Sequence, residues 1–374
     1  MKILHIAKFY YPVDGGIEST SKYIVDSLPQ FEHQVVCFNT RNNTEIDYVN
    51  TIKVTRVATL GKIASQPISI SYYRRLKTIL KEYSPDIIHL HYPNPLIAFF
   101  LVLLMPRNVH LVVHWHSDIV EQNFLYQFVK GIERKLLDSA NLILTTSPNY
   151  GIASKPLGRY MAKIKVLPSA IEPSLFMLDE GEAENVDAVK KKYQNKKIVF
   201  FVGRHVKYKG IVHLLEAERF ITSDCVFVIA GNGPLTDDLK RTYLSERIKW
   251  LGRINQDELK CCFYAADVFA FPSLTKNEAF GLVLAEAMYC YCPTVTFTIA
   301  GSGVNWVSLN GETGIEVKNG NSRLLADAID SLLTDDSMRN QYAQNARRRV
   351  LKYFVMDEIK KELTKIYTDL MNNV

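Results

Sequence analysis

Short apolar runs recur through the first half of the chain, and segments with helical periodicity lie between several of them. The runs occupy residues 3–7, 34–38, 87–90, 111–114 and 142–145, and the helical segments occupy 19–28, 72–83 and 124–138. Strands that are apolar on both faces and alternate with helices are typical of a parallel sheet covered on both sides. The first half is therefore expected to form a doubly wound α/β domain.

The same alternation returns after a break that begins at Pro168. An acidic stretch at 179–187 and a basic one at 190–197 precede apolar runs at 198–202, 226–230, 248–251, 268–271 and 294–297. Helical periodicity fits 210–220, 235–244, 257–265, 281–290 and 322–333. The chain thus predicts two successive Rossmann-like units, followed by a charged helical tail with a break near Phe354.

Ligands of open α/β sheets bind beyond the carboxyl ends of the strands. Two such units facing each other would enclose a cleft between the domains. The residues that directly follow the predicted strands are therefore the candidate functional residues.

Composition and charge narrow the function classes only slightly. The 374 residues carry a net charge of +6 from scattered basic residues, which suits anionic ligands or an acidic membrane surface. The sequence has no arginine-rich arm and no zinc-finger spacing, so nucleic acid is not an expected partner. The six cysteines form no CxxC pair and are expected to be reduced.

Two further features bear on the location of the protein. The N-terminus enters a strand pattern without the apolar core of a signal peptide. The longest apolar stretch, 96–105, is far shorter than the roughly 20 residues that span a bilayer. We therefore expect a cytoplasmic protein.

Asp14-Gly15-Gly16 stands between the first strand and the following helix. Paired glycines let a ligand approach the backbone and expose amides at a helix N-terminus. A plain turn has the same pattern, so both interpretations stay open at this motif.

The segment from Gly203 to Gly210 joins strand 198–202 to the next helix and carries Arg204 and Lys209. An arginine can bind two phosphate oxygens at once, and a lysine adds a point charge, so this loop suits a diphosphate. A solvated basic loop is the alternative, but the flanking glycines and the position after a strand favour binding.

Gly231-Asn232-Gly233-Pro234 begins like a dinucleotide-binding fingerprint. Leu235 and Thr236 follow, and the third glycine of the fingerprint is missing. We therefore expect a tight turn near a nucleotide, and a hydride-transfer enzyme is disfavoured.

The most specific motif runs from Glu278 through Gly281 to Glu286. Gly281 is expected to open a helix whose first amides form a seat for phosphate. Eight helical residues span about 12 Å, roughly the length of a sugar–diphosphate–ribose, so one carboxylate could hold the sugar and the other the ribose. Two solvated glutamates are the alternative, but Glu286 has apolar neighbours, among which an unpaired carboxylate is costly.

His114, His116 and Asp118 follow strand 111–113. Two histidines and a carboxylate suggest a metal, but no further cluster completes a metal site, so we expect none. For His116 a substrate-binding role in the cleft is favoured over a packed structural role. Tyr92 and Asn94 follow another strand and are expected, with Asp118, to bind the acceptor.

In order and spacing these motifs resemble glycosyltransferase family 4, whose members are retaining enzymes with the two-Rossmann GT-B fold. The resemblance covers nearly the whole chain and also includes Gly311-Glu312-Thr313-Gly314. It implies domains at 1–172 and 173–354, with a final helix at about 355–374 that crosses back to the first domain.

The resemblance implies roles for individual residues. Arg204 and Lys209 would hold the donor diphosphate, Glu286 the ribose and Glu278 the donor sugar. Gly16 would approach the phosphates, and His116 would touch the transferred sugar. The implied catalytic residues are His116, Arg204, Lys209 and Glu278. The implied donor-binding residues are Gly15, Gly16, Gly203, Arg204, Lys209, Gly231, Gly233, Glu278, Ala279, Phe280, Gly281, Leu282 and Glu286.

Two departures from the family pattern concern the linker and the sugar pocket. Residues 168–172 read Pro-Ser-Ala-Ile-Glu where Pro-Asn-Gly-(Ile/Val)-Asp is frequent, and Ala279 stands where glycine is common. Segments 116–120 and 146–150 look most like mannosyl-type transferases of bacterial surface-polysaccharide assembly. This finer resemblance implies GDP-mannose as donor and a saccharide or lipid-linked saccharide as acceptor.

No residue pair stands out as nucleophile and acid/base. The family picture is a same-face substitution in which the leaving diphosphate oxygen helps to deprotonate the acceptor, without a metal or other cofactor. A UDP-sugar transferase, a phosphorylase of the same architecture, a silent nucleotide-sugar binder and an NAD-linked oxidoreductase are the alternatives. The complete set of charged motif residues disfavours the silent binder.

Residues 72–77 mix aromatic and basic side chains on a predicted helix of the first domain. Such a face can dock on anionic lipid, although an ordinary amphipathic helix explains the pattern equally well. Peripheral contact with the inner membrane is therefore a further expectation.

Overall fold

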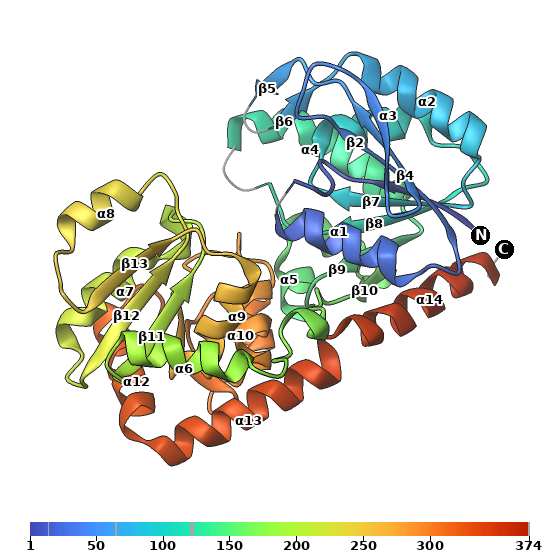
Figure 1. Cartoon of the computed structure of the whole chain (residues 1–374). Coiled ribbons are helices and arrows are strands. Elements are labelled where there is room, and N and C mark those ends of the chain that lie inside the picture. The colour runs from blue at the N-terminus through green and yellow to red at the C-terminus, as the bar shows by residue number, and fades with distance from the viewer. Residues whose placement is uncertain (14, 64–65, 120–122, 373–374) are drawn as a thin grey trace. The chain divides into compact units, whose positions relative to one another are not determined.

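The computed structural model describes residues 1–13, 15–63, 66–119 and 123–372. The chain divides into two compact units (Figure 1). Unit 1 comprises Met1–Ser169 and Met356–Val374, and unit 2 comprises Ala170–Val355. The boundaries expected from the sequence, 172/173 and 354/355, lie within three residues of these positions.

Unit 1 is built on an eight-stranded sheet in the order β10-β9-β8-β7-β1-β2-β4-β3. Neighbouring strands are parallel, except that β3 runs antiparallel to β4. The strands are β1 Lys2–Ile6, β2 Glu32–Phe38, β3 Glu45–Val49, β4 Ile52–Val57, β7 Ile87–Tyr92, β8 His110–Trp115, β9 Leu142–Thr145 and β10 Ile164–Val166. A separate small hairpin consists of β5 Gly61–Ile63 and β6 Gln66–Ile68.

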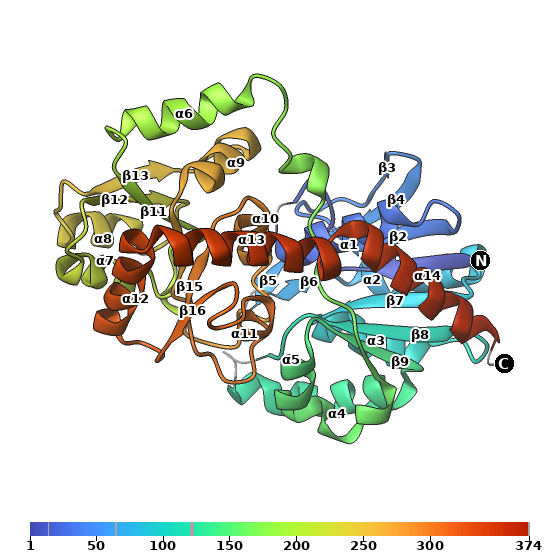
Figure 2. The same ribbon diagram turned by 90° about the horizontal axis from the view of Figure 1, so that it is seen from below.

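The helices of unit 1 include one that comes from the end of the chain. They are α1 Gly16–Ser27, α2 Ser71–Tyr83, α3 Pro95–Leu104, α4 Asn123–Ser139, α5 Pro148–Ala153, the short 3-10 turns Lys155–Arg159 and Met161–Lys163, and α14 Met356–Asn372. Helix α14 buries Ile359, Leu363, Ile366 and Tyr367 and packs against α1 (Figure 2). These residues share one helical face, so the expected return of the final helix to the first domain is confirmed.

Unit 2 contains a six-stranded parallel sheet in the order β13-β12-β11-β14-β15-β16. The strands are β11 Lys197–Val202, β12 Cys225–Ala230, β13 Ile248–Gly252, β14 Val268–Phe271, β15 Thr294–Phe297 and β16 Gly314–Val317. The helices are α6 Glu182–Lys192, α7 Ile211–Ala217, α8 Thr236–Thr242, α9 Gln256–Ala265, α10 Leu282–Tyr289, α11 Val304–Val307, α12 Ser322–Thr334 and α13 Asp336–Tyr353, with 3-10 turns at Pro173–Leu175, Lys207–Lys209 and Glu218–Phe220.

The strand order of unit 2 reverses between β11 and β14. At such a switch point the loops that leave the two strands diverge, and a ligand can bind between them. The loops after β11, β12 and β14 carry the predicted donor-binding motifs, and their strands are neighbours in the sheet. The fold therefore brings these motifs to one edge.

Several smaller expectations can be compared with the structure. All six cysteines are buried and unpaired, as expected. None of the helices in the described ranges is long and apolar enough to cross a membrane. Helix α2 does not present the mixed aromatic and basic face that was expected, because Tyr72 is fully buried and its ring packs 4.6 Å from that of Phe38. Only the basic side chains Arg74, Arg75 and Lys77 of that segment are exposed.

Candidate active site

The basic loop of unit 2 leaves β11 and passes against the loop that leaves β14. Gly210 has a positive φ of 64°, and a Cβ at this position would lie only 1.9 Å from the carbonyl oxygen of Pro272. The amide of Leu274 donates a hydrogen bond of 2.8 Å to the carbonyl oxygen of Tyr208. These backbone contacts fix Lys209, which lies between them in sequence.

Lys209 forms an ion pair with Glu278, which follows β14. Both side chains are largely buried, with 14% and 13% of their surface exposed. Burial alone would lower the pKa of Lys209, but the adjacent Glu278 carboxylate outweighs this effect and raises it. The structure thus brings together two of the four residues predicted to be catalytic, and it keeps the lysine charged.

A residue that the sequence analysis did not single out also contacts this pair. The hydroxyl of Ser273 donates a hydrogen bond of 3.3 Å to the Glu278 carboxylate. Ser273 is the second residue after β14, so its position beyond a strand end was the available signal. A lone serine after a strand is too common a feature to be chosen from one sequence.

The segment between Glu278 and α10 is held by the loop that precedes α11. The Ser302 hydroxyl donates a hydrogen bond to the carbonyl oxygen of Glu278, and the Gly303 amide donates one of 2.9 Å to that of Ala279. Phe280 is buried, with its ring 5.4 Å from that of Phe354. The expected donor-binding residues Ala279 and Phe280 therefore anchor the motif through backbone and core contacts.

Gly281 is the N-cap of α10 and has a φ of 83°, which favours glycine. The amides of Leu282 and Val283, in the first turn, have no intrahelical acceptor, because the first internal bonds begin at Leu284. The helix therefore starts at the predicted position, directly after Gly281, and presents unpaired donors next to Glu278.

Glu286 is the fifth residue of α10. Its side chain is half-buried, and burial raises its pKa to about 7. Within the described part of the chain, no group donates a hydrogen bond to its carboxylate. An uncompensated carboxylate is unfavourable in such surroundings, so this position is suited to a ligand that supplies donors.

Gly231 and Gly233 shape the edge of the site through their contact with the basic loop. A Cβ at Gly231 would lie 2.0 Å from the carbonyl oxygen of Gly203, and one at Gly233 would lie 2.4 Å from that of His205. The His205 amide also donates a hydrogen bond of 3.1 Å to Asn232. Gly231 and Gly233 are therefore needed for close packing between the loops, and Gly203 belongs to the loop against which they pack.

Arg204 is exposed, as is Lys207 of the same loop. Its guanidinium has no acidic partner among the residues that the structure describes. Unlike Lys209, it can therefore reach an anionic ligand without first breaking an ion pair.

In unit 1 the glycine motif precedes α1. Gly15 is the N-cap and Gly16 the first helical residue, and a Cβ on Gly16 would meet no atom within 4 Å. Space therefore remains for a ligand at this helix start. Asp14 lies outside the described residues.

His116 follows β8 and is almost fully buried, with 6% of its surface exposed. Its Nε2 lies 3.0 Å from Nδ1 of His91, the penultimate residue of the neighbouring strand β7. Burial lowers the pKa of His116 to about 3, so the ring is neutral at physiological pH. His116 is thus equipped for hydrogen bonding and not for charge stabilisation.

The three residues predicted to bind the acceptor have structural roles instead. Tyr92 is fully buried, and its hydroxyl donates a hydrogen bond of 2.7 Å to Glu133. Asn94 is also fully buried and caps α3 through its side-chain oxygen. Asp118 accepts hydrogen bonds from Trp115 and Ser154. The acceptor prediction is therefore wrong for Tyr92 and Asn94, since neither side chain is accessible, and Asp118 is already engaged.

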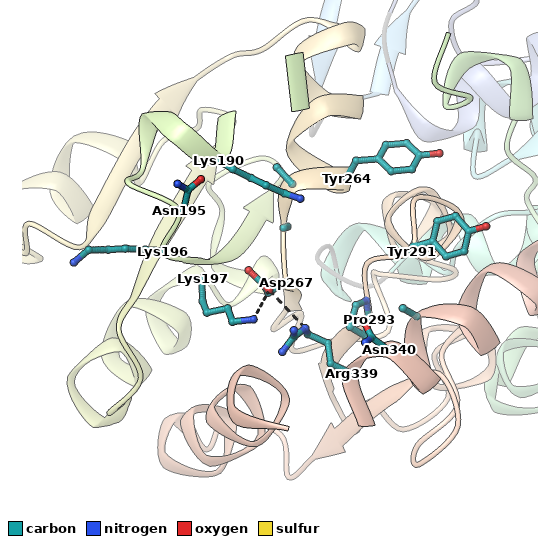
Figure 3. A pocket seen from close by; sticks show the side chains of 13 residues that line it. Lys190, Asn195, Lys196, Lys197, Tyr264, Asp267, Tyr291, Pro293, Arg339 and Asn340 are labelled. Atoms are coloured by element: carbon teal, nitrogen blue, oxygen red, sulfur yellow. Dashed lines mark hydrogen bonds and ion pairs between the residues drawn. The ribbon is translucent and has the colours of Figure 1, made fainter. Parts of the chain in front are cut away.

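A pocket of about 320 Å³ lies at the opposite ends of the unit 2 strands (Figure 3). Two of its cations are already paired, because Asp267 lies 3.2 Å from Nζ of Lys197 and 3.5 Å from Nε of Arg339. The pocket contains none of the predicted donor-binding residues. It is therefore not a candidate for the donor site.

Comparison with protein families decides what kind of protein carries this arrangement. Residues 14–175 match the model "Glycosyltransferase Family 4", and residues 182–349 match the model "Glycosyl transferases group 1". The chain is therefore a glycosyltransferase, with a family 4 segment followed by a group 1 segment. Its two Rossmann-like units are the two domains of the GT-B fold.

Relatives of this glycosyltransferase match over most of its length. The O-antigen chain mannosyltransferase C of Escherichia coli is 28% identical and covers 100% of both chains. The D-rhamnosyltransferase WbpZ of Pseudomonas aeruginosa is 25% identical over 95% of this chain and 92% of its own.

A further relative and a solved structure carry a UDP-sugar in their names. The UDP-Gal:alpha-D-GlcNAc-diphosphoundecaprenol alpha-1,3-galactosyltransferase of Escherichia coli is 24% identical over 100% of this chain and 98% of its own. The structure of Anabaena HepE in complex with UDP-glucose has a TM-score of 0.79 and 19% identity, and covers 99% of this chain and 100% of that chain.

The contact between Gly231 and the basic loop leads to a prediction for this glycosyltransferase. Gly231→Ala should lower the free energy of unfolding by about 3–5 kcal/mol, because a strained φ is combined with a backbone collision. Gly252 also has a positive φ, but a Cβ there would meet no atom within 4 Å. Gly252→Ala should therefore cost only about 1–2 kcal/mol. Urea unfolding of both variants measures the difference, and equal losses would contradict a special role for the loop contact.

Proposed function

We propose that this glycosyltransferase moves a hexose from a nucleotide-sugar donor to a saccharide or lipid-linked saccharide acceptor during surface-polysaccharide assembly. The observation that carries the proposal is the arrangement of Lys209, Glu278 and Glu286 around the start of α10 in unit 2. Mannose from GDP-mannose is the first choice of donor, supported by a mannosyltransferase relative that covers the whole chain. A UDP-sugar donor is the second choice, supported by the relative whose name gives UDP-Gal.

The charges of unit 2 match the parts of such a donor. Arg204, Lys209 and the first amides of α10 supply positive potential for the diphosphate. Glu286 has an unpaired carboxylate, which suits the hydroxyls of the ribose, and Glu278 suits those of the sugar. A diphosphate that binds Lys209 competes with its ion pair to Glu278, which frees that carboxylate for the sugar.

The same residues account for the chemistry that the family implies. Negative charge grows on the leaving diphosphate as the bond to the sugar breaks, and Arg204 and Lys209 stabilise it. His116 is neutral, so its role is to donate or accept a hydrogen bond with a sugar hydroxyl. No metal and no other cofactor is assigned a part in the transfer.

A thermal-shift panel of GDP, UDP, ADP, dTDP and NAD tests the donor site. A ligand that binds only the folded protein raises the melting temperature. With GDP we expect a clear rise in the melting temperature of the native protein. In Lys209→Ala the same rise should need at least a tenfold higher GDP concentration, because a charge-assisted contact to phosphate is lost. Lys207→Ala removes an exposed lysine of the same loop and serves as the matched control.

The outcomes separate the candidate functions. A shift with UDP would keep the transferase and replace the mannose donor. Binding without turnover of any nucleotide sugar would favour a silent binder. The absence of a shift with every nucleoside diphosphate, or an active Lys209→Ala enzyme, would contradict the proposed donor site.

The raised pKa of Glu286 leads to a pH prediction. Near pH 7 about half of the free carboxyl groups carry a proton, which must leave before the carboxylate can accept ribose hydroxyls. The ionised fraction rises about tenfold between pH 6 and pH 8 for a pKa of about 7. We therefore expect the affinity for GDP to rise by up to about tenfold over this range and to level off above it.

Glu286→Gln isolates this effect, because the amide does not titrate. Calorimetric titration of both proteins with GDP at pH 6, 7 and 8 removes the contribution of the phosphate groups by difference. Parallel pH profiles would show that Glu286 does not contact the nucleotide.

We also propose that unit 1 makes the peripheral membrane contact that a lipid-linked acceptor requires. Helix α3 exposes Phe99 and Leu103, with 41% and 58% of their surfaces accessible. Helix α2 lies beside α3, since the ring of Phe100 contacts that of Tyr73 at 5.7 Å, and it carries exposed Arg74 and Arg75. Exposed apolar side chains beside basic ones suit an anionic bilayer.

Flotation with vesicles that contain anionic lipid tests this contact. The protein should float at low salt, and the double variant Arg74→Glu/Arg75→Glu should lose most of its binding. Lys191→Glu/Lys192→Glu changes the net charge equally but on α6 of unit 2, and should leave flotation intact. Equal losses in the two double variants would reduce the contact to an effect of overall charge.

A further inference from the structure

Six buried histidines line one face of the unit 1 sheet. They come from neighbouring strands, and the register places His5 opposite His89 and His91 opposite His114. Residues two apart on a strand share a face, which adds His116 to this row. The full set is His5, His33, His89, His91, His114 and His116. Their neighbouring rings have centroid separations between 4.0 and 6.0 Å.

Three of the six can direct ring nitrogens toward one point. One nitrogen from each of His89, His91 and His114 lies within 4.8 Å of the other two. Their ring centroids are 4.7, 5.4 and 5.5 Å apart. Imidazoles around a tetrahedral ion with metal–nitrogen bonds of about 2.0–2.1 Å have centroids about 5 Å apart, close to these separations. The rings of His89 and His91 are stacked at an interplanar angle of 22° and would have to turn for their nitrogens to converge.

Two of the three histidines have a ring nitrogen with no partner among the described residues, whereas Nε2 of His89 lies 3.3 Å from Nδ1 of His114 and would exchange this contact for the ion. Nε2 of His91 and Nε2 of His114 make no hydrogen bond to any described residue, and both side chains are 1% exposed. Unsatisfied buried polar atoms are rare and unfavourable. Two of them within one cluster of histidines indicate an occupant that accepts lone pairs.

The remaining nitrogens are held in the manner of metal-binding histidines. Nδ1 of His89 lies 2.5 Å from the hydroxyl of Tyr367 on α14, and Nδ1 of His91 lies 3.0 Å from Nε2 of His116. A hydrogen bond at the nitrogen that does not bind the ion orients the ring of a metal ligand.

We propose that His89, His91 and His114 bind one divalent transition-metal ion of the zinc class, which ties β7 to β8. A donor set made only of imidazoles suits zinc, cobalt, nickel or copper and excludes magnesium and calcium. His5 is a candidate for a fourth ligand, because its ring lies 5.2 Å from that of His89 and its Nδ1 has no hydrogen-bond partner among the described residues. No metal was expected from the sequence because one strand end carries too few ligands, whereas the register adds two ligands from the neighbouring strand.

Metal content tests the proposal on the full chain without a polyhistidine tag. The protein is isolated from cells grown with added Zn²⁺ or Co²⁺, so that the ion can enter during folding. We expect about one zinc per chain by mass spectrometry, and visible absorption bands of low-symmetry Co²⁺ from the cobalt-grown protein. His91→Asn and His114→Asn should each lose at least nine-tenths of the metal.

His33→Asn is the matched control, since His33 is buried on the same face but outside the group of three. It should retain the metal. Circular dichroism and gel filtration report whether each variant is folded. The metal content of the native protein tests the proposal even if a variant does not fold. Less than a tenth of an equivalent in the native protein would show that the site holds water only, and unchanged metal in both variants would place the ion elsewhere. The response to GDP is measured independently, so either proposal can fail without the other.

Discussion

The arrangement of unit 2 depends on backbone contacts between loops that leave neighbouring parallel strands. The loop after β11 touches the loop after β12 at Gly203 and Gly231, and the loop after β14 at Gly210 and Pro272. Side chains at these glycines would separate the loops by the thickness of at least one carbon atom. The resulting close packing brings Lys209 into contact with Glu278 and places both next to the start of α10. The electrostatic features of the proposed donor site thus follow from a steric requirement.

The two glutamates of the main motif are in different electrostatic states. Glu278 is neutralised by Lys209, whereas Glu286 accepts no hydrogen bond from the described residues and burial raises its pKa to about 7. A ligand can replace Glu278 as the partner of Lys209 without a large change in net charge. Glu286, by contrast, gains favourable contacts only when a ligand arrives. The protein therefore keeps one carboxylate masked and the other available before the donor binds.

The sequence was sufficient to predict the fold class, the position of α10 and the loops of unit 2, because the residues that end a strand and begin the next helix are neighbours in sequence. It failed for β4, where Arg56 interrupts the apolar pattern; the buried guanidinium bonds to the carbonyl oxygens of Tyr10 and Tyr11, a compensation that only the fold provides. It also failed for Tyr92 and Asn94, since the position after a strand does not say which way a side chain points. The contact of His91 with His116 depends on the register of two strands, which the sequence does not specify.

Helix α14 has a consequence for the order in which the chain can fold. Unit 2 is an insertion between two segments of unit 1, and α14 supplies Leu363 and Tyr367 to the interior of unit 1. During synthesis the 186 residues of Ala170–Val355 leave the ribosome before this helix does. The domain made first is therefore completed last, and its apolar face beside α1 stays uncovered until α14 has been made. A ribosome that stalls before Met356 would leave a finished unit 2 attached to an unfinished unit 1.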